Sequence, residues 1–411
     1  QLQLYEMMSG LRNFLLLLFA ALAGSCFAQS LRHTLSALGN PEFHGNRVEL
    51  LPTANEKYDR MFKSIQEAEH FVHVEYFSVT HDSVGAKFMS LLEQKARQGV
   101  EVRLIIDGYG NMKSRYRMSK ARMKSLTEAG VKWAFFDPIK FPWFNHVRHR
   151  DHRKIVVVDG REAFTGGMNV ARYYITGTKR LGLWRDMHIR LTGSVVDEYE
   201  RIFENIWRKE TKEVLDTTRY RNAWQDAGSS VISVVNREPG RLSKTMRKAY
   251  VAALDAAKRE VRIVNPYPTN VRSVRRAIKR AAERGVVVKI MVSGTSDVSM
   301  TPDVVAIEMK KLLKRGCRIY YYDGGFHHTK VMTVDGEYCT IGTANLDGRS
   351  MLFDYEVNAF VFDAALAAQL DSIFDEDLKQ SQLLTPKNFK QRFSLGHRIV
   401  GRMLVPVRSV F

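Results

Sequence analysis

One nine-residue pattern occurs twice in this chain, as HRKIVVVDG at residues 152–160 and as HTKVMTVDG at residues 328–336. Each copy continues to a glycine-rich turn that ends in asparagine, GGMN at residues 166–169 and GTAN at residues 342–345. The asparagine stands 17 residues after the histidine in both copies (169 − 152 and 345 − 328). A match of this length and order does not arise twice by chance, so the chain contains an internal duplication.

The duplication extends upstream of both motifs. ARQGVEVRLII at residues 96–106 matches AERGVVVKIMV at residues 282–292, and GVKW at residues 130–133 matches GCRI at residues 316–319, both at an offset of 186 (285 − 99 and 316 − 130). The motifs are offset by 176 (328 − 152), so the first copy carries ten additional residues (186 − 176), around residues 139–144. Each copy alternates helix-like segments, a glycine and short β-branched runs, which favours βαβ units and a largely parallel sheet with helices on its faces.

This arrangement predicts an α/β fold of two tandem α-β-α sandwich domains related by an internal pseudo-twofold repeat. We expect the first domain at residues 40–207 and the second at residues 231–385. A polar, poorly periodic stretch at residues 208–230 is interpreted as the linker, and residues 386–411 as a basic amphipathic tail. The chain has 411 residues, of which 45% are hydrophobic, and is therefore long enough to bury two cores.

Residues 1–28 have the layout of a signal peptide or membrane anchor. Arg12 precedes an apolar run at residues 14–24, and small residues follow it up to Ala28. The run is shorter than the about 20 residues that a membrane span needs. Cleavage after Ala28, lipidation at Cys26 and retention as an anchor are all compatible with this pattern. We expect association with a membrane through this segment; an export signal or anchor would make it face the periplasm, but the sequence does not determine the side of the membrane.

Lysine and arginine exceed aspartate and glutamate by 19 residues (63 − 44). Such a surplus favours an anionic partner, and by itself it does not choose between nucleic acid and anionic lipid. The three cysteines, Cys26, Cys317 and Cys339, have neither the spacing of a zinc site nor that of a disulfide framework. Cys317 and Cys339 stand in apolar strand-like runs and are expected to be small buried residues.

The duplicated motif carries the residue types of phosphodiester chemistry. Because residues i and i+2 of a strand face the same way, His152 and Lys154 are expected to share a face, as are His328 and Lys330. The duplication would bring both pairs to one seam, where two lysines bind the phosphate oxygens. One imidazole can then attack phosphorus, forming a phosphohistidine, while the other protonates the leaving oxygen. A second alcohol or water resolves the intermediate. This chemistry needs no metal, and we expect no cofactor.

Four further motif residues are assigned from their position. Asn169 and Asn345 would add amide donors for the phosphate. Asp159 and Asp335 have the opposite strand parity and precede glycine. Because Asp-Gly is a preferred pair in tight hairpin turns, both aspartates are interpreted as structural.

A histidine nucleophile needs a partner that orients its other ring nitrogen. Asp186 and Glu356 each follow a motif in an alternating strand and are candidates, with an ordinary solvated carboxylate as the alternative. The three-residue spacing of His146, His149 and His152 suggests a metal site. We discount it because the spacing to Lys154 explains His152, and the other two lie in a basic, aromatic loop. His327 lacks the motif's spacing to lysine and aspartate and is not assigned a role.

These motifs resemble the phospholipase D superfamily, whose signature is His-x-Lys-x4-Asp followed by a glycine-rich turn and asparagine. The match covers about residues 48–363, and GTANLDGRS at residues 342–350 with Glu356 is similar to the second motif region of bacterial cardiolipin synthases. The resemblance implies two phospholipase D-like domains in an enzyme that joins two phospholipids. Two phosphatidylglycerols would give cardiolipin and glycerol. It also implies that His152 is the nucleophile and His328 the acid and base.

Two features depart from the family's pattern. Gly167 stands where the family commonly has serine, so a hydroxyl contact at this place is expected from Thr343 alone. The family's usual pair of N-terminal membrane spans is replaced by one short apolar segment.

The superfamily also contains hydrolytic phospholipases and nucleases, so the motif defines the chemistry better than the substrate. Aromatic residues 141–144 beside Arg148, Arg150 and Arg153 could dip into a membrane interface, or simply pack on the domain. Residues 389–404 mix basic and apolar residues at helical spacing, as in a helix that lies on a membrane or docks on the second domain. We expect an anionic phospholipid at a membrane surface as the partner and no nucleic acid; the sequence does not indicate an oligomeric state.

Overall fold

The structure is a computed structural model of the chain, and it describes residues 29–112, 117–142, 148–221, 224, 226–240, 242–269 and 271–406. The expected signal or anchor at residues 1–28 lies outside the described residues. The strands and helices of the first half are β1 (Glu42–Leu51), α2 (Ala54–Glu67), β2 (Phe71–Tyr76), α3 (Ser83–Arg97), β3 (Glu101–Asp107), α4 (Lys120–Glu128), β4 (Lys132–Phe136), β5 (Lys154–Val158), β6 (Glu162–Gly166), α5 (Tyr173–Thr176), β7 (Trp184–Arg185), β8 (His188–Thr192) and α6 (Val196–Thr211). Those of the second half are β9 (Ser230–Arg237), α7 (Thr245–Ala256), β10 (Glu260–Val264), α8 (Arg272–Glu283), β11 (Val287–Ser293), α9 (Thr301–Leu313), β12 (Arg318–Tyr322), β13 (Phe326–His327), β14 (Val331–Val334), β15 (Tyr338–Gly342), α10 (Gly348–Leu352), β16 (Glu356–Phe362), α11 (Ala364–Leu378), β17 (Ser381–Leu383), α12 (Pro386–Arg392) and α13 (Leu395–Leu404).

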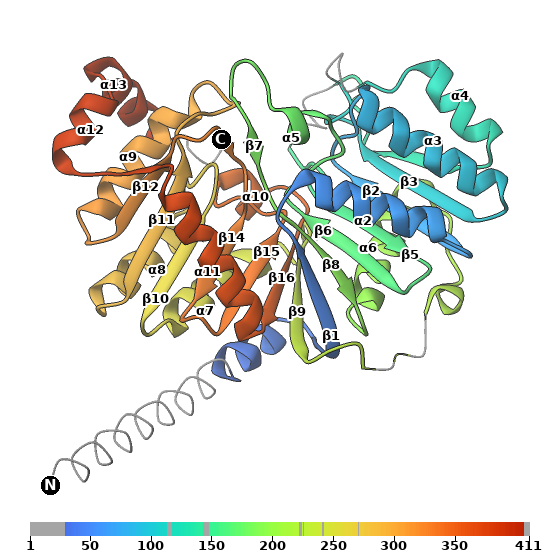
Figure 1. The fold of residues 1–411 in the computed structure, drawn as a ribbon, viewed down its shortest axis with the longest axis horizontal. Coiled ribbons are helices and arrows are strands. Elements are labelled where there is room, and N and C mark those ends of the chain that lie inside the picture. The colour runs from blue at the N-terminus through green and yellow to red at the C-terminus, as the bar shows by residue number, and fades with distance from the viewer. Residues whose placement is uncertain are drawn as a thin grey trace, which may run out of the picture.

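One sheet, of 15 strands within the described residues, runs through both halves of the molecule (Figure 1). Its centre is the antiparallel pair of β1 and β9. Outward from this pair, the order β8-β6-β5-β2-β3-β4 on one side corresponds to β16-β15-β14-β10-β11-β12 on the other, with β17 added at one edge. The order is therefore palindromic, which confirms two related α/β halves and places the pseudo-twofold axis between β1 and β9.

The prediction of a largely parallel sheet is wrong. Among the described strands, the parallel pairs are β2 with β3, β3 with β4, β10 with β11, β11 with β12, and β7 with β13. The other strand pairs of the sheet are antiparallel. The physical reason is that each motif strand continues into its neighbour through a tight hairpin, which can only connect antiparallel strands.

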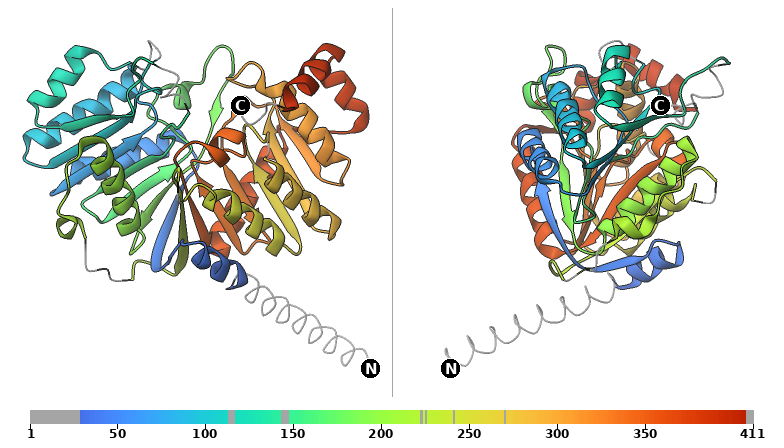
Figure 2. Two further views of the ribbon diagram at one scale, coloured as in Figure 1. Left: turned by 180° about the vertical axis from the view of Figure 1, so that it is seen from behind. Right: turned by 90° about the vertical axis from the view of Figure 1, so that its right-hand side faces the viewer.

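Helices cover both faces of the sheet in each half. In the first half α2, α3 and α4 pack on one face and α6 on the other, while in the second half α7, α8 and α9 lie opposite α11 (Figure 2). Strand β5 shows why its sequence is continuously apolar. Ile155 and Val157 enter the core beneath α6, whereas Val156 and Val158 enter the core beneath α2 and α3. A strand buried on both faces has no polar side.

The predicted linker and tail differ in detail from the structure. Helix α6 continues to Thr211, so the expected linker at 208–230 begins inside a helix. The tail from residue 386 forms α12 and α13, and α13 packs against α9. Among the described residues, no helix is both long and apolar enough to span a bilayer.

Candidate active site

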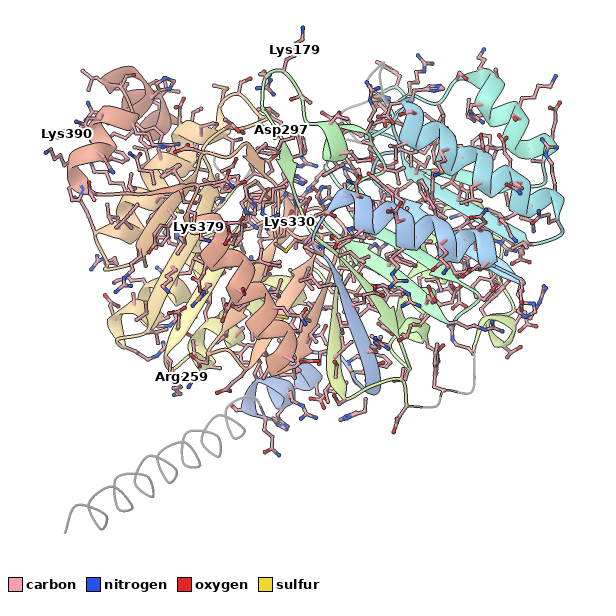
Figure 3. All side chains as sticks on the ribbon, in the orientation of Figure 1. Lys179, Arg259, Asp297, Lys330, Lys379 and Lys390 are labelled. Carbon is pink, nitrogen blue, oxygen red and sulfur yellow. The ribbon has the colours of Figure 1, made fainter. Side chains whose placement is uncertain are left out.

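The two halves enclose a cavity of about 490 Å³ beyond the ends of β2, β3, β10 and β11. It is lined by His152 and Asn169 from the first half and by His328 and Asn345 from the second. Lys330, labelled in Figure 3, lies near the middle of the molecule where the halves meet. The duplicated motifs therefore converge on one site, as the repeat predicts.

The motif histidines lie just before their strands and not within them. Strand β5 begins at Lys154, and β14 begins one residue after Lys330. Each lysine ammonium donates a hydrogen bond to the backbone carbonyl of its own histidine, Lys154 to His152 and Lys330 to His328. A local hydrogen bond thus brings histidine and lysine together, in place of the regular strand alternation that the sequence predicted.

Each histidine is paired with a carboxylate from the opposite half. His152 Nδ1 lies 3.0 Å from Glu356 Oε1, and His328 Nδ1 lies 2.6 Å from Asp186 Oδ2. Both proposed orienting partners therefore contact a motif histidine. The sequence did not indicate the crossing, because each carboxylate follows the motif of its own half.

Backbone pairing between the halves produces this crossing. The His152 amide donates to the Tyr355 carbonyl at 3.0 Å, directly before Glu356. On the other side the His328 amide donates to the Arg185 carbonyl at 2.7 Å, directly before Asp186. Each motif is thus tied, one residue away, to the strand that carries its carboxylate.

Both carboxylates are held ionised. Burial opposes this, but Lys330 and His328 hold the pKa of Asp186 below its ordinary value. In the same way, against the effect of burial, His152 and Lys154 lower the pKa of Glu356. An ionised carboxylate accepts from Nδ1–H, which leaves the Nε2 lone pair of a neutral imidazole free to act as nucleophile or base.

His328 occupies the more enclosed position of the two histidines. The rings of Tyr174, Trp184, Tyr267 and Phe326 surround it at centroid distances of 5.5 to 6.3 Å. Burial and the neighbouring Lys330 ammonium lower the pKa of His328 to about 4, despite the opposing charge of Asp186. Its imidazole is therefore neutral at pH 7 in the free protein.

The two lysines titrate near neutrality. Burial lowers the pKa of Lys154 to about 7 and that of Lys330 to about 8, although Glu356 and Asp186 act in the opposite direction. Each ammonium is present below its pKa and lost above it. The positive charge available to a tetrahedral anion therefore falls as the pH rises from 7 to 9.

We expect the affinity for sulfate, whose own charge is constant over this range, to fall above pH 7 by up to about tenfold per pH unit. Calorimetric titration between pH 6 and 9 measures this. A Lys154→Met variant should bind more weakly at pH 6 and lose the decline near pH 7, while the decline near pH 8 from Lys330 remains. A pH-independent affinity in the unmodified protein would contradict this expectation.

The remaining motif residues occupy two kinds of position. Asn169 and Asn345 are each 7% exposed and line the cavity, and their Oδ1 atoms have no hydrogen-bond partner among the described residues. Asp159 and Asp335 instead lie at hairpin turns with φ of 50° and 56°. Asp159 accepts from the amides of residues 69–71, and Asp335 from those of residues 258–260. Each aspartate fastens its hairpin to the start of the adjacent strand.

Neighbouring residues complete the support of the carboxylates. Thr343 and Ser350 hydroxyls both donate to Glu356. The first half differs, because a Cβ added to Gly167 would lie 2.2 Å from Asp186 Oδ1. Glycine at this position leaves the space that the Asp186 carboxylate occupies, which explains the departure from serine.

Lys57 was not identified from the sequence. Its ammonium donates to the carbonyls of Met168 at 3.1 Å and Asn169 at 3.0 Å, and so supports the turn that presents Asn169. A signal existed in the sequence, because Lys57 interrupts the apolar stripe of α2 formed by Ala54, Tyr58 and Met61.

The other histidines have structural partners. His327 Nε2 lies 3.1 Å from Asp377 Oδ2, and the ring of His149 lies 2.8 Å from the Phe353 carbonyl. His146 lies outside the described residues. Across the described part of the chain, no three His, Cys, Asp or Glu side chains form a group that could hold a metal ion.

Two of the arginines expected to meet lipid headgroups are buried. Arg150 bonds to Asp107 at 3.0 Å, and Arg153 bonds to Glu75 at 2.6 Å. The expectation of headgroup contact is therefore wrong for Arg153, which is fully buried and neutralises a buried carboxylate. Arg150 is only 2% exposed, but it is among the residues that line the cavity. Arg148 and Phe141 are exposed, whereas residues 143–147 lie outside the described part of the chain.

Comparison with known proteins shows the family of the chain. The family model described as "Cardiolipin synthase, PLD-like domain" matches residues 61–207 and 250–378. The chain is 35% identical over 349 residues to the probable cardiolipin synthase YwiE of Bacillus subtilis (strain 168), covering 84% of this chain and 69% of that protein. It is 33% identical over 374 residues to a cardiolipin synthase of Geobacillus sp. (strain WCH70), covering 90% and 74%.

A solved structure shares the fold at low sequence identity. The phosphatidylserine synthase of Haemophilus influenzae Rd KW20 superposes with a TM-score of 0.69 at 13% identity, covering 94% of this chain and 98% of that one. The likeness extends over both halves of the sheet. From the family match, the two relatives and the duplicated site, the chain belongs to the cardiolipin synthase family of phospholipase D-like phosphatidyltransferases.

Proposed function

We propose that the protein joins two phosphatidylglycerol molecules into cardiolipin and releases glycerol, through a phosphohistidine intermediate. The observation that carries the proposal is the pair of crossed histidine–carboxylate contacts facing one cavity between two buried lysines. Two histidines suffice for a double displacement at phosphorus, because one bonds to the phosphoryl group while the other moves the proton.

In the first step, His152 Nε2 attacks the phosphorus of the donor lipid. The bond from phosphorus to the oxygen of the headgroup glycerol breaks, and His328 donates a proton to that oxygen. Lys154 and Lys330 stabilise the charge on the non-bridging oxygens, with the amides of Asn169 and Asn345 as further donors.

In the second step, neutral His328 accepts the proton of a glycerol hydroxyl on the acceptor lipid. The oxygen attacks phosphorus, and the bond to His152 Nε2 breaks, which restores the free histidine. His328 can accept this proton because its imidazole is neutral in the free protein. A bound phosphodiester offsets the Lys330 charge that lowers this pKa, so substrate binding favours the protonated acid of the first step.

The cavity supports a lipid alcohol as acceptor over water. Tyr173, Tyr174, Trp184 and Tyr267 form an aromatic wall in which a hydroxyl carried by a lipid headgroup can displace solvent. We therefore propose anionic phospholipids in a membrane surface as substrates, with water as the acceptor in the alternative hydrolytic activity and nucleic acid outside the substrate class.

Mass spectrometry of lipids after incubation with phosphatidylglycerol vesicles tests this proposal. Cardiolipin and free glycerol in equal amounts, from the unmodified protein and not from a His152→Ala variant, are expected. Phosphatidic acid as the main product would show that water is the acceptor and that the protein is a hydrolase, not a transferase. Cleavage of DNA without any lipid product would contradict both lipid activities and show that the protein is a nuclease.

A further inference from the structure

Helix α13 carries the largest continuous group of exposed apolar side chains on one described element. The exposed fractions are 63% for Leu395, 46% for Ile399, 37% for Val400 and 72% for Met403. Leu395, Ile399 and Met403 are spaced four residues apart and therefore lie along one side of the helix. This stripe has no partner among the described residues that would cover it.

The opposite side of α13 is firmly docked. A Cβ added to Gly401 would lie 2.3 Å from the Asp303 carbonyl, so α13 approaches the backbone of α9 closely. His397 Nδ1 lies 2.7 Å from Asp303 Oδ1. Both alternatives considered for this segment thus apply to different sides of one helix: one side is docked and the other is apolar and exposed.

Arg398 and Arg402 belong to the same helix as the apolar stripe. Burial and four neighbouring cations lower the pKa of Lys310 on α9, which places Lys314, Arg402, Arg398 and Lys390 within its electrostatic range. Lys390 projects from the outer side of α12 (Figure 3). The like charges of such a cluster repel one another in the isolated protein, and an anionic surface would reduce this electrostatic repulsion.

Two exposed apolar residues lie at the cavity, just before α9, the helix on which α13 packs. Val298 lines the cavity and is 43% exposed, and Met300 is 46% exposed directly before Thr301, which opens α9 and also lines the cavity. Helix α13, α5 and the loop between α5 and β7 lie along the same edge of the molecule in both the front and rear views (Figures 1 and 2). Tyr109 lines the cavity and is 44% exposed, and the exposed residues Ile175 and Leu183 directly adjoin the cavity-lining Tyr174 and Trp184 in the chain.

We propose that the α13 surface, defined as Leu395, Ile399, Val400 and Met403 with the surrounding cations, inserts into an anionic phospholipid bilayer and holds the cavity mouth against it. The inference rests on the proposed function, because a lipid-facing mouth is useful only for a lipid substrate. Aliphatic side chains among cations match the acyl and headgroup layers of such a bilayer. Nucleic acid would favour aromatic stacking residues, which the stripe lacks, and a second copy would bring like charges together.

Insertion is measured with two matched tryptophan reporters in the full chain. Met403→Trp lies on the α13 surface, and Val214→Trp is the control. Val214 is similarly exposed, at 75%, but it belongs to the segment that connects α6 to β9 and not to the α13 surface. Vesicles of phosphatidylglycerol with brominated acyl chains should quench the added fluorescence of Met403→Trp and not that of Val214→Trp. Equal quenching of both, or of neither, would overturn the proposal. Residues 29–37 lie at the opposite edge of the molecule (Figure 1). Quenching of the tryptophan at residue 403 therefore reports insertion of the α13 surface and not membrane attachment through the N-terminal segment.

A second variant links the surface to turnover. Replacing Leu395, Ile399 and Met403 by serine should lower cardiolipin formation on vesicles by roughly tenfold or more. Phosphoenzyme formation from a monomeric short-chain phosphatidylglycerol should not change. Normal turnover on vesicles would overturn the role of the surface in catalysis. Absence of phosphoenzyme in the unmodified protein as well would instead contradict the proposed function, while the quenching result would still decide whether α13 inserts.

Discussion

Replacing His152 by alanine is expected to abolish the phosphoenzyme and to lower phosphatidyl transfer by at least about 10³-fold. The covalent intermediate needs a ring nitrogen at this position, and Lys154, whose ammonium is turned to the His152 carbonyl, cannot replace it. His328→Ala should lower turnover by a similar factor for another reason, the loss of the proton that the leaving glycerol requires. Rapid-quench trapping of phosphoenzyme, together with turnover, measures both effects.

The leaving group separates the two roles. In a phosphatidyl ester of p-nitrophenol, the leaving p-nitrophenolate departs without being protonated. The His328→Ala variant should therefore form phosphoenzyme from this substrate at nearly the normal rate. His152→Ala should remain inactive with the same substrate. Should the activated ester rescue His152→Ala and not His328→Ala, the roles of the two histidines would be reversed. The neutral state of the His328 imidazole makes that outcome chemically meaningful.

The crossed carboxylates give the second large effect. Glu356→Gln and Asp186→Asn keep the shape of each side chain but remove the charge that orients and stabilises the histidine. Each is expected to lower turnover by about 10² to 10⁴-fold, as in other sites where a carboxylate holds a catalytic imidazole. Because Glu356 contacts His152 and Asp186 contacts His328, the activated ester should rescue Asp186→Asn and fail to rescue Glu356→Gln.

This pattern is specific to the tertiary arrangement. If each carboxylate served the histidine of its own half, the rescue would be reversed, with Glu356→Gln restored and Asp186→Asn inactive. Glu200→Gln is the matched control. Glu200 Oε1 lies 2.7 Å from His73 Nδ1, and neither residue is among those that line the cavity, so this variant should keep its catalytic rate.

Much of the fold was predictable because the signals are local. The duplicated segments revealed two related halves, and Asp159-Gly160 and Asp335-Gly336 indicated hairpins because these pairs adopt positive φ readily. The antiparallel majority of the sheet was missed, since a short apolar run does not record the direction of its neighbour. The burial of Arg150 and Arg153 was missed because their acidic partners, Asp107 and Glu75, are distant in sequence.

The sequence by itself determined which residues we propose to carry the chemistry: two histidines, two lysines and two asparagines at matching spacings, with aspartates at the turns. Only the tertiary structure decided how the halves share a site. His152 and Glu356 are 204 residues apart, and His328 and Asp186 are 142 apart. Such contacts follow from the pseudo-twofold axis between β1 and β9 and from the backbone pairs that tie each motif to the other half. Local sequence patterns encode backbone geometry within a few residues, whereas the partner across a domain seam is set by how two complete halves pack.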